Sequence, residues 1–261
     1  MSYHELYVEQ GSGPAVVFSH GTLMDATMFA PQLDYLAARG YRAIAYNSRV
    51  LTGEPGAHTL DDLVEDCRRL LDRLGIDKCV VAGMSVGGCM AMPFALKHQD
   101  RLNGLILIAV TSQAYPPEEQ AAFEAEFDKL DVDGMMPREF AEWAAPYCFG
   151  ETTYAENMAL VDHWIDRWAT TVPARAVLYQ GRSWIKKDDI TDRLREIEVP
   201  ALVVHGDEDV PIPIERALPM VDVLPDATLA RIPKAGHTVN LEQAAAVNEA
   251  IGSFLERIDF Q

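Results

Sequence analysis

Residues 80–92 read VVAGMSVGGCMAM, and this stretch decides the fold that we expect. A β-branched apolar run passes into a helix-forming run, and Ser85 lies between them with Gly83 and Gly87 on either side. A residue on a tight turn from strand to helix needs neighbours without side chains, because its backbone is strained and its flanks are crowded. The stretch therefore predicts a strand, a sharp turn that lifts the Ser85 hydroxyl above the sheet edge, and a helix that Gly88 allows to pack closely.

The same alternation of apolar runs and helical patterns continues on both sides of this turn. Strands are expected at 15–21, 41–47, 77–83 and 102–109, and at the beginnings of 199–213 and 228–240. Helices are expected at 59–75, 86–98 and 241–258, and Thr59 can cap the first of these. Near-continuous apolar strands that alternate with helices predict an α/β fold, with a mostly parallel sheet and helices on both faces.

The alternation stops between residues 112 and 187, where the patterns are helical. We expect residues 1–111 and 188–261 to form the core, and residues 112–187 to form a helical unit inserted in it. This segment holds all four tryptophans and 12 of the chain's 22 aromatic residues. Such rings either build the core of a small helical unit or line an apolar pocket beneath it. For Trp143 and Trp164 we consider the second role, as substrate-binding residues.

The charge balance excludes several classes of partner. The chain has 22 basic and 40 acidic residues and a formal net charge of −18, which repels nucleic acid phosphates and anionic lipid. It has no apolar run of about 18 residues that could cross a membrane, and its beginning lacks the features of a secretory signal. We therefore expect a cytoplasmic protein that acts on a small molecule and binds neither nucleic acid nor a membrane. The sequence does not indicate an oligomeric state.

The cysteines and histidines do not form a metal-binding pattern. Cys67, Cys79, Cys89 and Cys148 have no CxxC spacing, and we expect them to be reduced and buried. The seven histidines form no HExxH motif and no His/Cys cluster. No metal site is expected.

Ser85 also fits the Gly-x-Ser-x-Gly nucleophile elbow, whose strand–turn–helix context the sequence supplies. A serine hydroxyl is a poor nucleophile near neutral pH and needs a general base that a third group orients. Later loops supply His237 in IPKAGHTVN, and Asp207 and Asp209 in VVHGDEDVPIP. Asp207 lies at the strand edge and can brace the turn by accepting backbone N–H bonds. Asp209 lies farther along and can reach His237, so the expected catalytic set is Ser85, Asp209 and His237.

An attacking serine creates a tetrahedral oxyanion, which needs two preset donors. The backbone N–H of Val86, directly after the nucleophile, is one candidate. The backbone N–H of Thr22, in the stretch HGTLMD after the first expected strand, is the other. Structural roles are expected for two competing histidines: His20 braces the first strand's loop, and His205 is buried at a strand end.

Four stretches together resemble the α/β-hydrolase superfamily, and the resemblance covers essentially the whole chain: FSHGTLMD, GMSVGG, VPALVVHGDEDVPIP and IPKAGHTVN. The sequence is most similar to small, helically capped serine hydrolases, which include esterases, enol-lactonases, C–C bond hydrolases and perhydrolases of haloperoxidase type. The resemblance implies a mostly parallel eight-stranded sheet, a helical cap at 112–187 and an acyl-enzyme route without a cofactor. The family pattern of glycine, two residues and aspartate also selects Asp209.

One loop departs from the family pattern. Many relatives carry Asp-x-Arg-Gly-x-Gly after the corresponding strand, whereas this chain reads YNSRVLTGEPG. Arg49 fits the pattern, but Asn47 replaces the aspartate and Val50 replaces the first glycine. A serine at position 85 argues against haloalkane dehalogenases and epoxide hydrolases, which resemble this fold but use aspartate there.

These patterns favour a hydrolase that cleaves a carboxylic ester or lactone of a small or medium-sized, largely apolar substrate. Hydrolysis of a C–C bond and perhydrolysis use the same groups, so the motifs do not separate them from ester cleavage. An alternative of a different class is a ligand sensor that keeps the same residues and turns over slowly.

Overall fold

The computed structural model describes residues 6–53, 56–258 and 260. Its sheet has seven strands in the order β1-β3-β2-β4-β5-β6-β7. The strands are β1 (Tyr7–Gln10), β2 (Ala15–Ser19), β3 (Arg42–Tyr46), β4 (Cys79–Met84), β5 (Leu102–Ile108), β6 (Ala201–Gly206) and β7 (Ala227–Ile232). Every neighbouring pair is parallel except β1 and β3, which are antiparallel. The predicted mostly parallel sheet is confirmed.

The expected number of strands was one too high for the part of the chain that the structure describes. There, the antiparallel edge of the sheet consists of β1 alone, which pairs with β3 over four residues. Strand β1 was not predicted from the sequence, because its four residues are half-buried or exposed and show no apolar run.

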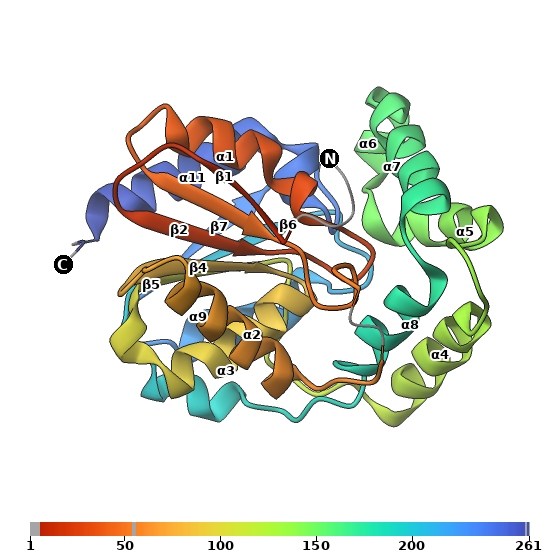
Figure 1. The fold of residues 1–261 in the computed structure, drawn as a ribbon, viewed down its shortest axis with the longest axis horizontal. Coiled ribbons are helices and arrows are strands. Elements are labelled where there is room, and N and C mark those ends of the chain that lie inside the picture. Colours follow the sequence, from red (N-terminus) through yellow and green to blue (C-terminus); the bar gives the residue numbers. More distant parts are fainter. Residues whose placement is uncertain (1–5, 54–55, 259, 261) are drawn as a thin grey trace.

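Helices cover both faces of the sheet, as predicted. Figure 1 shows α1 and α11 on one face and α2, α3 and α9 on the other. The helices are α1 (Ala30–Ala37), α2 (Leu60–Arg73), α3 (Val86–Lys97), α4 (Pro117–Phe127), α5 (Arg138–Cys148), α6 (Glu151–Glu156), α7 (Met158–Thr171), α8 (Ala174–Arg182), α9 (Leu218–Val223), α10 (Val239–Glu242) and α11 (Ala244–Arg257). The segment predicted as one helix over 241–258 is divided at Gln243, which has φ −127° and ψ 52° between α10 and α11.

Burial explains why the central strands are apolar throughout. Every residue of β2, β4 and β6 is buried, whereas the edge strands β1 and β7 contain mostly half-buried or exposed residues. A strand covered by helices on both faces has no solvent side, so its side chains do not alternate between apolar and polar. The four cysteines are free and buried, as expected.

Helix α2 shows how local sequence fixes an element. Thr59 and Asp62 form a capping box, in which the Asp62 amide donates to the Thr59 hydroxyl at 3.2 Å and the Thr59 amide donates to the Asp62 carboxylate at 2.8 Å. The buried side of the helix comprises Leu63, Val64, Cys67, Leu70 and Leu71. The predicted cap at Thr59 is confirmed.

The topology of the sheet selects one end for a site. From β2 the chain goes to β3 on one side, and β4 then lies on the other side of β2. In open parallel sheets such a reversal opens a crevice at the carboxyl ends of the strands, where ligands bind. The loop after β2 and the turn after β4, which carries Ser85, both lie at this crevice.

Residues 112–187, here called the insert, lie between the neighbouring strands β5 and β6 and contain helices α4 to α8. Within them the structure has one isolated bridge, between Met135 and Pro173, and no strand of the sheet. Figure 1 shows α4 to α8 grouped beyond one end of the sheet. Across the described residues, the helices are too short or too polar to span a bilayer.

Candidate active site

Ser85 occupies the turn between β4 and α3 with φ 53° and ψ −117°. A positive φ is strained for a residue with a Cβ, and such strain is found at functional sites. The Ser85 amide donates to the Ile108 carbonyl at 2.9 Å, which fixes the turn to β5. Helix α3 starts at the next residue, so its positive end lies beside the hydroxyl.

The glycines around Ser85 are required by close backbone contacts. A Cβ at Gly83 would lie 2.2 Å from the Gly87 carbonyl oxygen, and one at Gly87 would lie 2.2 Å from the Ser19 carbonyl oxygen. A Cβ at Gly88 would meet the Val110 side chain at 2.8 Å, so this glycine allows α3 to pack close to the chain that follows β5. The expected need for glycine at all three positions is confirmed.

Asp209 and His237 come from different loops and are in hydrogen-bond contact. Asp209 follows β6 and His237 follows β7, and the His237 Nδ1 atom lies 2.9 Å from Asp209 Oδ2. The second oxygen, Asp209 Oδ1, accepts the Ile212 amide at 3.0 Å. The Asp209 side chain is fully buried, whereas that of His237 is 12% exposed. The carboxylate is thus fixed, and the ring reaches the cavity described below.

His205 lies beside this pair but is directed elsewhere. Its Nε2 donates to the Ile212 carbonyl at 2.6 Å and lies 3.5 Å from Asp209 Oδ2. Burial lowers the pKa of His205 from its ordinary value of 6.5, and the ring is fully buried. The prediction that His205 is a buried structural histidine is confirmed.

The expected bracing role of Asp207 was wrong. Its carboxylate binds the Arg231 guanidinium, which joins β6 to β7 on the outside of the sheet. The aspartate that accepts a backbone N–H of the turn is Asp209, through its Oδ1 atom. The sequence places both aspartates in one loop, but only the strand pairing places Arg231 beside Asp207.

The two predicted oxyanion donors flank the nucleophile. Val86 is the first residue of α3, and amides in the first turn of a helix have no acceptor within the helix. Thr22 lies in the loop after β2 and lines the same cavity as Ser85. The side chain of Thr22 is also engaged: its Oγ1 accepts the indole N–H of Trp184 at 2.9 Å.

His20 holds the loop that carries Thr22, as expected. Its Nδ1 donates to the Gly21 carbonyl at 2.8 Å, and its Nε2 accepts the Ser48 amide at 3.0 Å. Burial lowers the pKa of His20, which favours this neutral ring. The loops after β2 and β3 are thereby joined behind the site.

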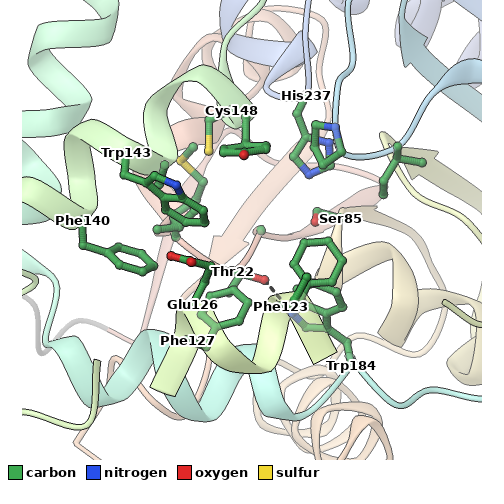
Figure 2. A pocket seen from close by; sticks show the side chains of 18 of the residues that line it. Thr22, Ser85, Phe123, Glu126, Phe127, Phe140, Trp143, Cys148, Trp184 and His237 are labelled. Atoms are coloured by element: carbon green, nitrogen blue, oxygen red, sulfur yellow. Dashed lines mark hydrogen bonds between the residues drawn. The ribbon is translucent and has the colours of Figure 1, made fainter. Parts of the chain in front are cut away.

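A cavity of about 460 Å³ lies over Ser85, between the core and the insert. Figure 2 shows Ser85 and His237 on one side of it, and Trp143 and Phe140 on the opposite side. Most of the lining is apolar and aromatic, and the described lining residues include no lysine or arginine. The lining residues contributed by the insert are Tyr115, Ala122, Phe123, Ala125, Glu126, Phe127, Phe140, Trp143, Ala144, Tyr147, Cys148 and Trp184.

The two tryptophans singled out from the sequence lie in different places. Trp143 lines the cavity and is 40% exposed. Trp164 is 2% exposed, does not belong to the lining and packs near Trp168 at a ring separation of 6.3 Å. The role of Trp164 as a pocket residue is therefore not supported, and its position is that of a core residue of the insert.

Glu126 is the acidic residue of this lining. Its Oε2 atom lies 2.6 Å from the Lys129 ammonium, and the Glu126 side chain is 28% exposed. Lys129 itself is 61% exposed and does not line the cavity. The apolar cavity therefore carries a carboxylate on the wall opposite Ser85, as Figure 2 shows.

Two glutamates fasten the loops of Asp209 and His237 to the insert. The Glu242 carboxylate accepts the Gly236 amide at 3.0 Å and the Gly150 amide at 2.8 Å. Glu208 accepts the Thr152 amide at 2.9 Å. A Cβ at Gly236 would lie 2.4 Å from the Gly150 nitrogen, so the two backbones are in direct contact.

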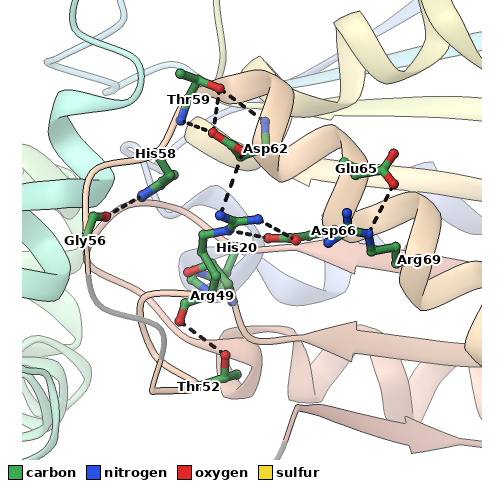
Figure 3. A network of polar contacts seen from close by, with 11 residues as sticks. His20, Arg49, Thr52, Gly56, His58, Thr59, Asp62, Glu65, Asp66 and Arg69 are labelled. Atoms are coloured by element: carbon green, nitrogen blue, oxygen red, sulfur yellow. Dashed lines mark hydrogen bonds and ion pairs between the residues drawn. The ribbon is translucent and has the colours of Figure 1, made fainter.

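The loop 46–56, which differs from the family pattern, has its own polar network, shown in Figure 3. Arg49 binds Asp66 of α2 through two hydrogen bonds of 2.7 Å. Asn47 Oδ1 accepts the Ala26 amide at 2.8 Å, so this residue joins the loop to the chain after β2. Residues 54 and 55 of the same stretch lie outside the described residues.

Several lining residues were missed in the sequence. Trp184, Phe123 and Tyr115 line the cavity and pack on one another, with Trp184 lying 5.2 Å from Phe123 and 5.4 Å from Tyr115. The only available signal was the aromatic content of the insert, which does not separate inward from core positions. Glu126 gave no signal, because a glutamate on a helix is usually a solvated residue.

Comparison with known proteins identifies one family, and the similar proteins are named for different reactions. Residues 16–250 match a family model described as "Alpha/beta hydrolase family". The chain is 29% identical over 252 residues to the protein named "Putative carbamate hydrolase RutD" of Variovorax paradoxus, covering 94% of this chain and 93% of the relative. It is 29% identical over 266 residues to "Non-heme haloperoxidase" of Rhodococcus erythropolis, covering 96% and 95%. A solved structure of a thermophilic esterase from Thermogutta terrifontis superposes with a TM-score of 0.88 at 29% identity, covering 96% and 92%.

Proposed function

Because the chain belongs to the alpha/beta hydrolase family, we propose that it cleaves a carboxylic ester or lactone through an acyl-enzyme formed on Ser85. The observation that carries the proposal is that Ser85, at a strained positive φ, and His237, bound to the buried Asp209, line one cavity. Strain at the nucleophile, a base in reach of the same space and a third group that orients the base are the features of this chemistry.

In the proposed reaction, Ser85 Oγ attacks the ester carbonyl carbon while His237 Nε2 takes the hydroxyl proton. Asp209 Oδ2 accepts a hydrogen bond from the Nδ1–H group of His237. This bond keeps the ring in the tautomer whose Nε2 can act as the base. The carbonyl oxygen becomes an oxyanion, and the backbone N–H groups of Thr22 and Val86 donate to it. Collapse breaks the bond to the leaving oxygen, which takes the proton from His237. Water then attacks the acyl carbon while His237 takes one of its protons. Collapse of this second intermediate breaks the bond to Ser85 Oγ, which takes the proton back from His237, and the carboxylic acid leaves.

The cavity indicates which esters fit. Its volume of about 460 Å³ and its aromatic walls suit a small or medium-sized, largely apolar acyl or alcohol group. Its described lining residues include Glu126 but no lysine or arginine that could neutralise a substrate carboxylate. We therefore propose neutral and cationic esters and lactones as substrates, and infer that anionic ones are poor.

We also propose that the insert acts as a cap. It supplies the wall opposite Ser85, and its contacts with Glu208 and Glu242 hold it over the strand ends. In this role it would exclude water from the acyl-enzyme until the leaving group has departed.

Perhydrolysis is the second candidate, and the haloperoxidase relative at 29% identity favours it. Hydrogen peroxide would replace water in the attack on the acyl group and release a peracid. The same Ser85, His237 and Asp209 would serve, so a direct assay must decide between the two nucleophiles.

The test combines covalent labelling with a substrate panel. A fluorophosphonate should add to wild type at Ser85, and Ser85→Ala should lose at least ~10³-fold in kcat on neutral esters. Ser183→Ala is a matched control, because the Ser183 hydroxyl donates to the Gln180 carbonyl at the end of α8. Labelling of Ser85→Ala at the wild-type rate would refute the proposal.

The same panel separates an enzyme from a ligand sensor. Neutral esters, lactones of graded ring size, and a peracid assay with added peroxide should be run together. A turnover number below about 10⁻² per second on every substrate, far under the enzyme median of ~10 per second, would favour the sensor.

A further inference from the structure

A hydrogen bond joins the insert to the loop that carries the proposed oxyanion donor. The indole Nε1 of Trp184 donates to Thr22 Oγ1 at 2.9 Å. Figure 2 shows this bond at the edge of the cavity, below Ser85. Trp184 follows α8 in the insert, whereas Thr22 follows β2 in the core, so 162 positions of sequence separate the partners.

Packing against other rings fixes the indole within the cavity wall. Its ring lies 5.4 Å from Tyr115, 5.2 Å from Phe123 and 6.0 Å from Phe127. Phe127 fits there because Gly181 has no side chain; a Cβ at that position would lie 2.9 Å from the Phe127 ring. Trp184 is only 9% exposed and lines the cavity. The indole is therefore held by neighbouring rings and is itself part of the cavity surface that a substrate meets.

A second contact holds the same loop from behind. The buried carboxylate of Asp25 binds Arg167 of α7, with Nε at 2.7 Å from Oδ2. Asp25 Oδ1 also accepts the Thr27 amide at 2.8 Å. The base of the loop is thus fixed by an ion pair, and the Trp184–Thr22 bond is the contact that a substrate can reach.

We propose that Trp184 is a positioning residue for the oxyanion loop, and that it rejects oversized acyl groups by releasing Thr22. The inference rests on the proposed function. Donation from Trp184 fixes the side-chain torsion of Thr22, and with it the peptide whose N–H would meet the oxyanion. An acyl group too large for the cavity displaces the indole, breaks the bond and leaves the loop free to turn.

The arrangement predicts whether discrimination against long acyl chains appears in KM or in kcat. A cavity wall that is only a steric barrier weakens binding of large substrates, so KM rises. A wall that also positions the oxyanion donor lowers stabilisation of the transition state, so kcat falls. Selection against long acyl chains should therefore be seen mainly in kcat.

The experiment uses Thr22→Val, Thr22→Ser, Trp184→Phe and the double variant Thr22→Val/Trp184→Phe on p-nitrophenyl esters from acetate to octanoate. Thr22→Val and Trp184→Phe should each lower kcat on acetate ~10-fold, less than the ~10²–10³-fold cost of removing an oxyanion donor. The double variant should be no slower than either single one, because both remove the same bond. Thr22→Ser keeps the acceptor and should therefore have a higher kcat than Thr22→Val.

Trp168→Phe is the matched control, since Trp168 is buried in the insert outside the cavity lining and its indole N–H has no acceptor among the described residues. Measured where the variant is fully folded, its kcat and KM on acetate should stay within about twofold of wild type. A trifluoromethyl ketone, which forms the tetrahedral adduct, should bind Thr22→Val ~10-fold more weakly than wild type, whereas the product acid should bind both equally.

Two results would overturn the inference. One is a wild-type kcat for Thr22→Val, a variant that removes one oxygen from a half-buried loop residue and keeps its shape. The other is additive losses in the double variant. If Ser85→Ala hydrolyses esters as fast as wild type, the proposed function fails; if only Ser85 is essential and Thr22→Val is unchanged, this inference alone fails.

Discussion

Asp209 uses one carboxylate oxygen for His237 and the other for its own loop. Oδ2 lies 2.9 Å from the His237 Nδ1, and Oδ1 accepts the Ile212 amide at 3.0 Å. The hydrogen bond to Ile212 prevents the carboxylate from rotating, so the orientation of the histidine ring is set by the turn after β6.

This division of labour predicts the effect of Asp209→Asn. The asparagine oxygen can still accept the Ile212 amide, but its NH₂ group then faces His237 and favours the wrong tautomer. We expect nearly unchanged folding and a kcat lowered by up to ~10⁴-fold, as for the same change in a well-studied serine protease triad. Asp207→Asn is the control: it breaks an exposed pair with Arg231, worth at most ~1 kcal/mol, and should leave kcat unchanged. Measurement of kcat and Tm for both variants decides; the reverse pattern would make Asp207 the orienting acid.

Because the carboxylate of Glu126 lies in the cavity wall, we expect positively charged substrates to be preferred over neutral and anionic ones. We expect choline esters to have a higher kcat/KM than the isosteric neutral 3,3-dimethylbutyl esters, and succinate monoesters to have a lower one. Glu126→Gln should reduce the choline-to-neutral ratio by ~2–5-fold, since a partly exposed charge pair contributes about 0.2–1 kcal/mol. Lys129→Met removes the competing ammonium and should raise the same ratio. If neither ratio moves, Glu126 does not contact the substrate.

Glu242 predicts a linked loss of stability and activity. Its carboxylate accepts the amides of Gly150 and Gly236 and the hydroxyls of Thr153 and Thr238. Glu242→Gln places an NH₂ group among these donors and should lower the free energy of unfolding by ~2–3 kcal/mol, as for loss of hydrogen bonds to a charged group.

Because Gly236 precedes His237, Glu242→Gln should also lower kcat at temperatures where the variant is fully folded. Glu249→Gln, at an exposed position of α11, is the control for the change of charge. An unchanged kcat in the folded Glu242→Gln variant would show that the glutamate only stabilises the fold.

Because three histidines are buried, we expect the protein to lose stability in mild acid. Burial holds the pKa of His20, His58 and His205 below the ordinary value of 6.5. Between the lowered pKa values of the folded protein and the ordinary value of the unfolded chain, the unfolded chain binds more protons than the folded one. The free energy of unfolding therefore rises with pH in this range. The full contribution is present above pH 6.5 and is lost as pH falls through the lowered values, at up to about 1.4 kcal/mol per histidine per pH unit.

Melting curves between pH 7.5 and 5.5 test this expectation. Tm should fall over that range in wild type. His20→Asn should have a lower Tm at pH 7.5 but a flatter slope, whereas His163→Asn, at an exposed position of α7, should keep the wild-type slope. A Tm that stays constant down to pH 5.5 would contradict the prediction.

The sequence was most informative where a position has one physical solution. Gly83 had to be glycine because the Gly87 carbonyl oxygen lies 2.2 Å from its would-be Cβ atom, and this crowding arises within the strand–turn–helix segment itself. The central strands were recognised because burial on both faces makes them apolar throughout. These constraints are local, or repeat along one element.

The sequence was least informative where a residue's role depends on a distant partner. Asp207 binds Arg231 of the neighbouring strand, and Thr22 binds Trp184 at the edge of the cavity; no spacing along the chain encodes either contact. Trp143 and Trp164 both lie in helices of the insert, yet only the packing of the insert turns the first toward the cavity. The edge strand β1 carries too few apolar residues to be recognised.

The contacts of the insert bear on how this scaffold can be re-engineered. The two ends of the insert lie side by side, since the Ile190 amide donates to the Ser112 carbonyl at 3.1 Å, so a short linker could replace it without breaking the sheet. Trimming it would nevertheless remove the supports of three loops at once, since Thr22, Glu208 and Glu242 all bind insert residues. Chimeras that exchange the insert between relatives should therefore also transfer the core residues that bind it. The unit that must be exchanged is defined by these contacts and not by the two points where the insert leaves and re-enters the core.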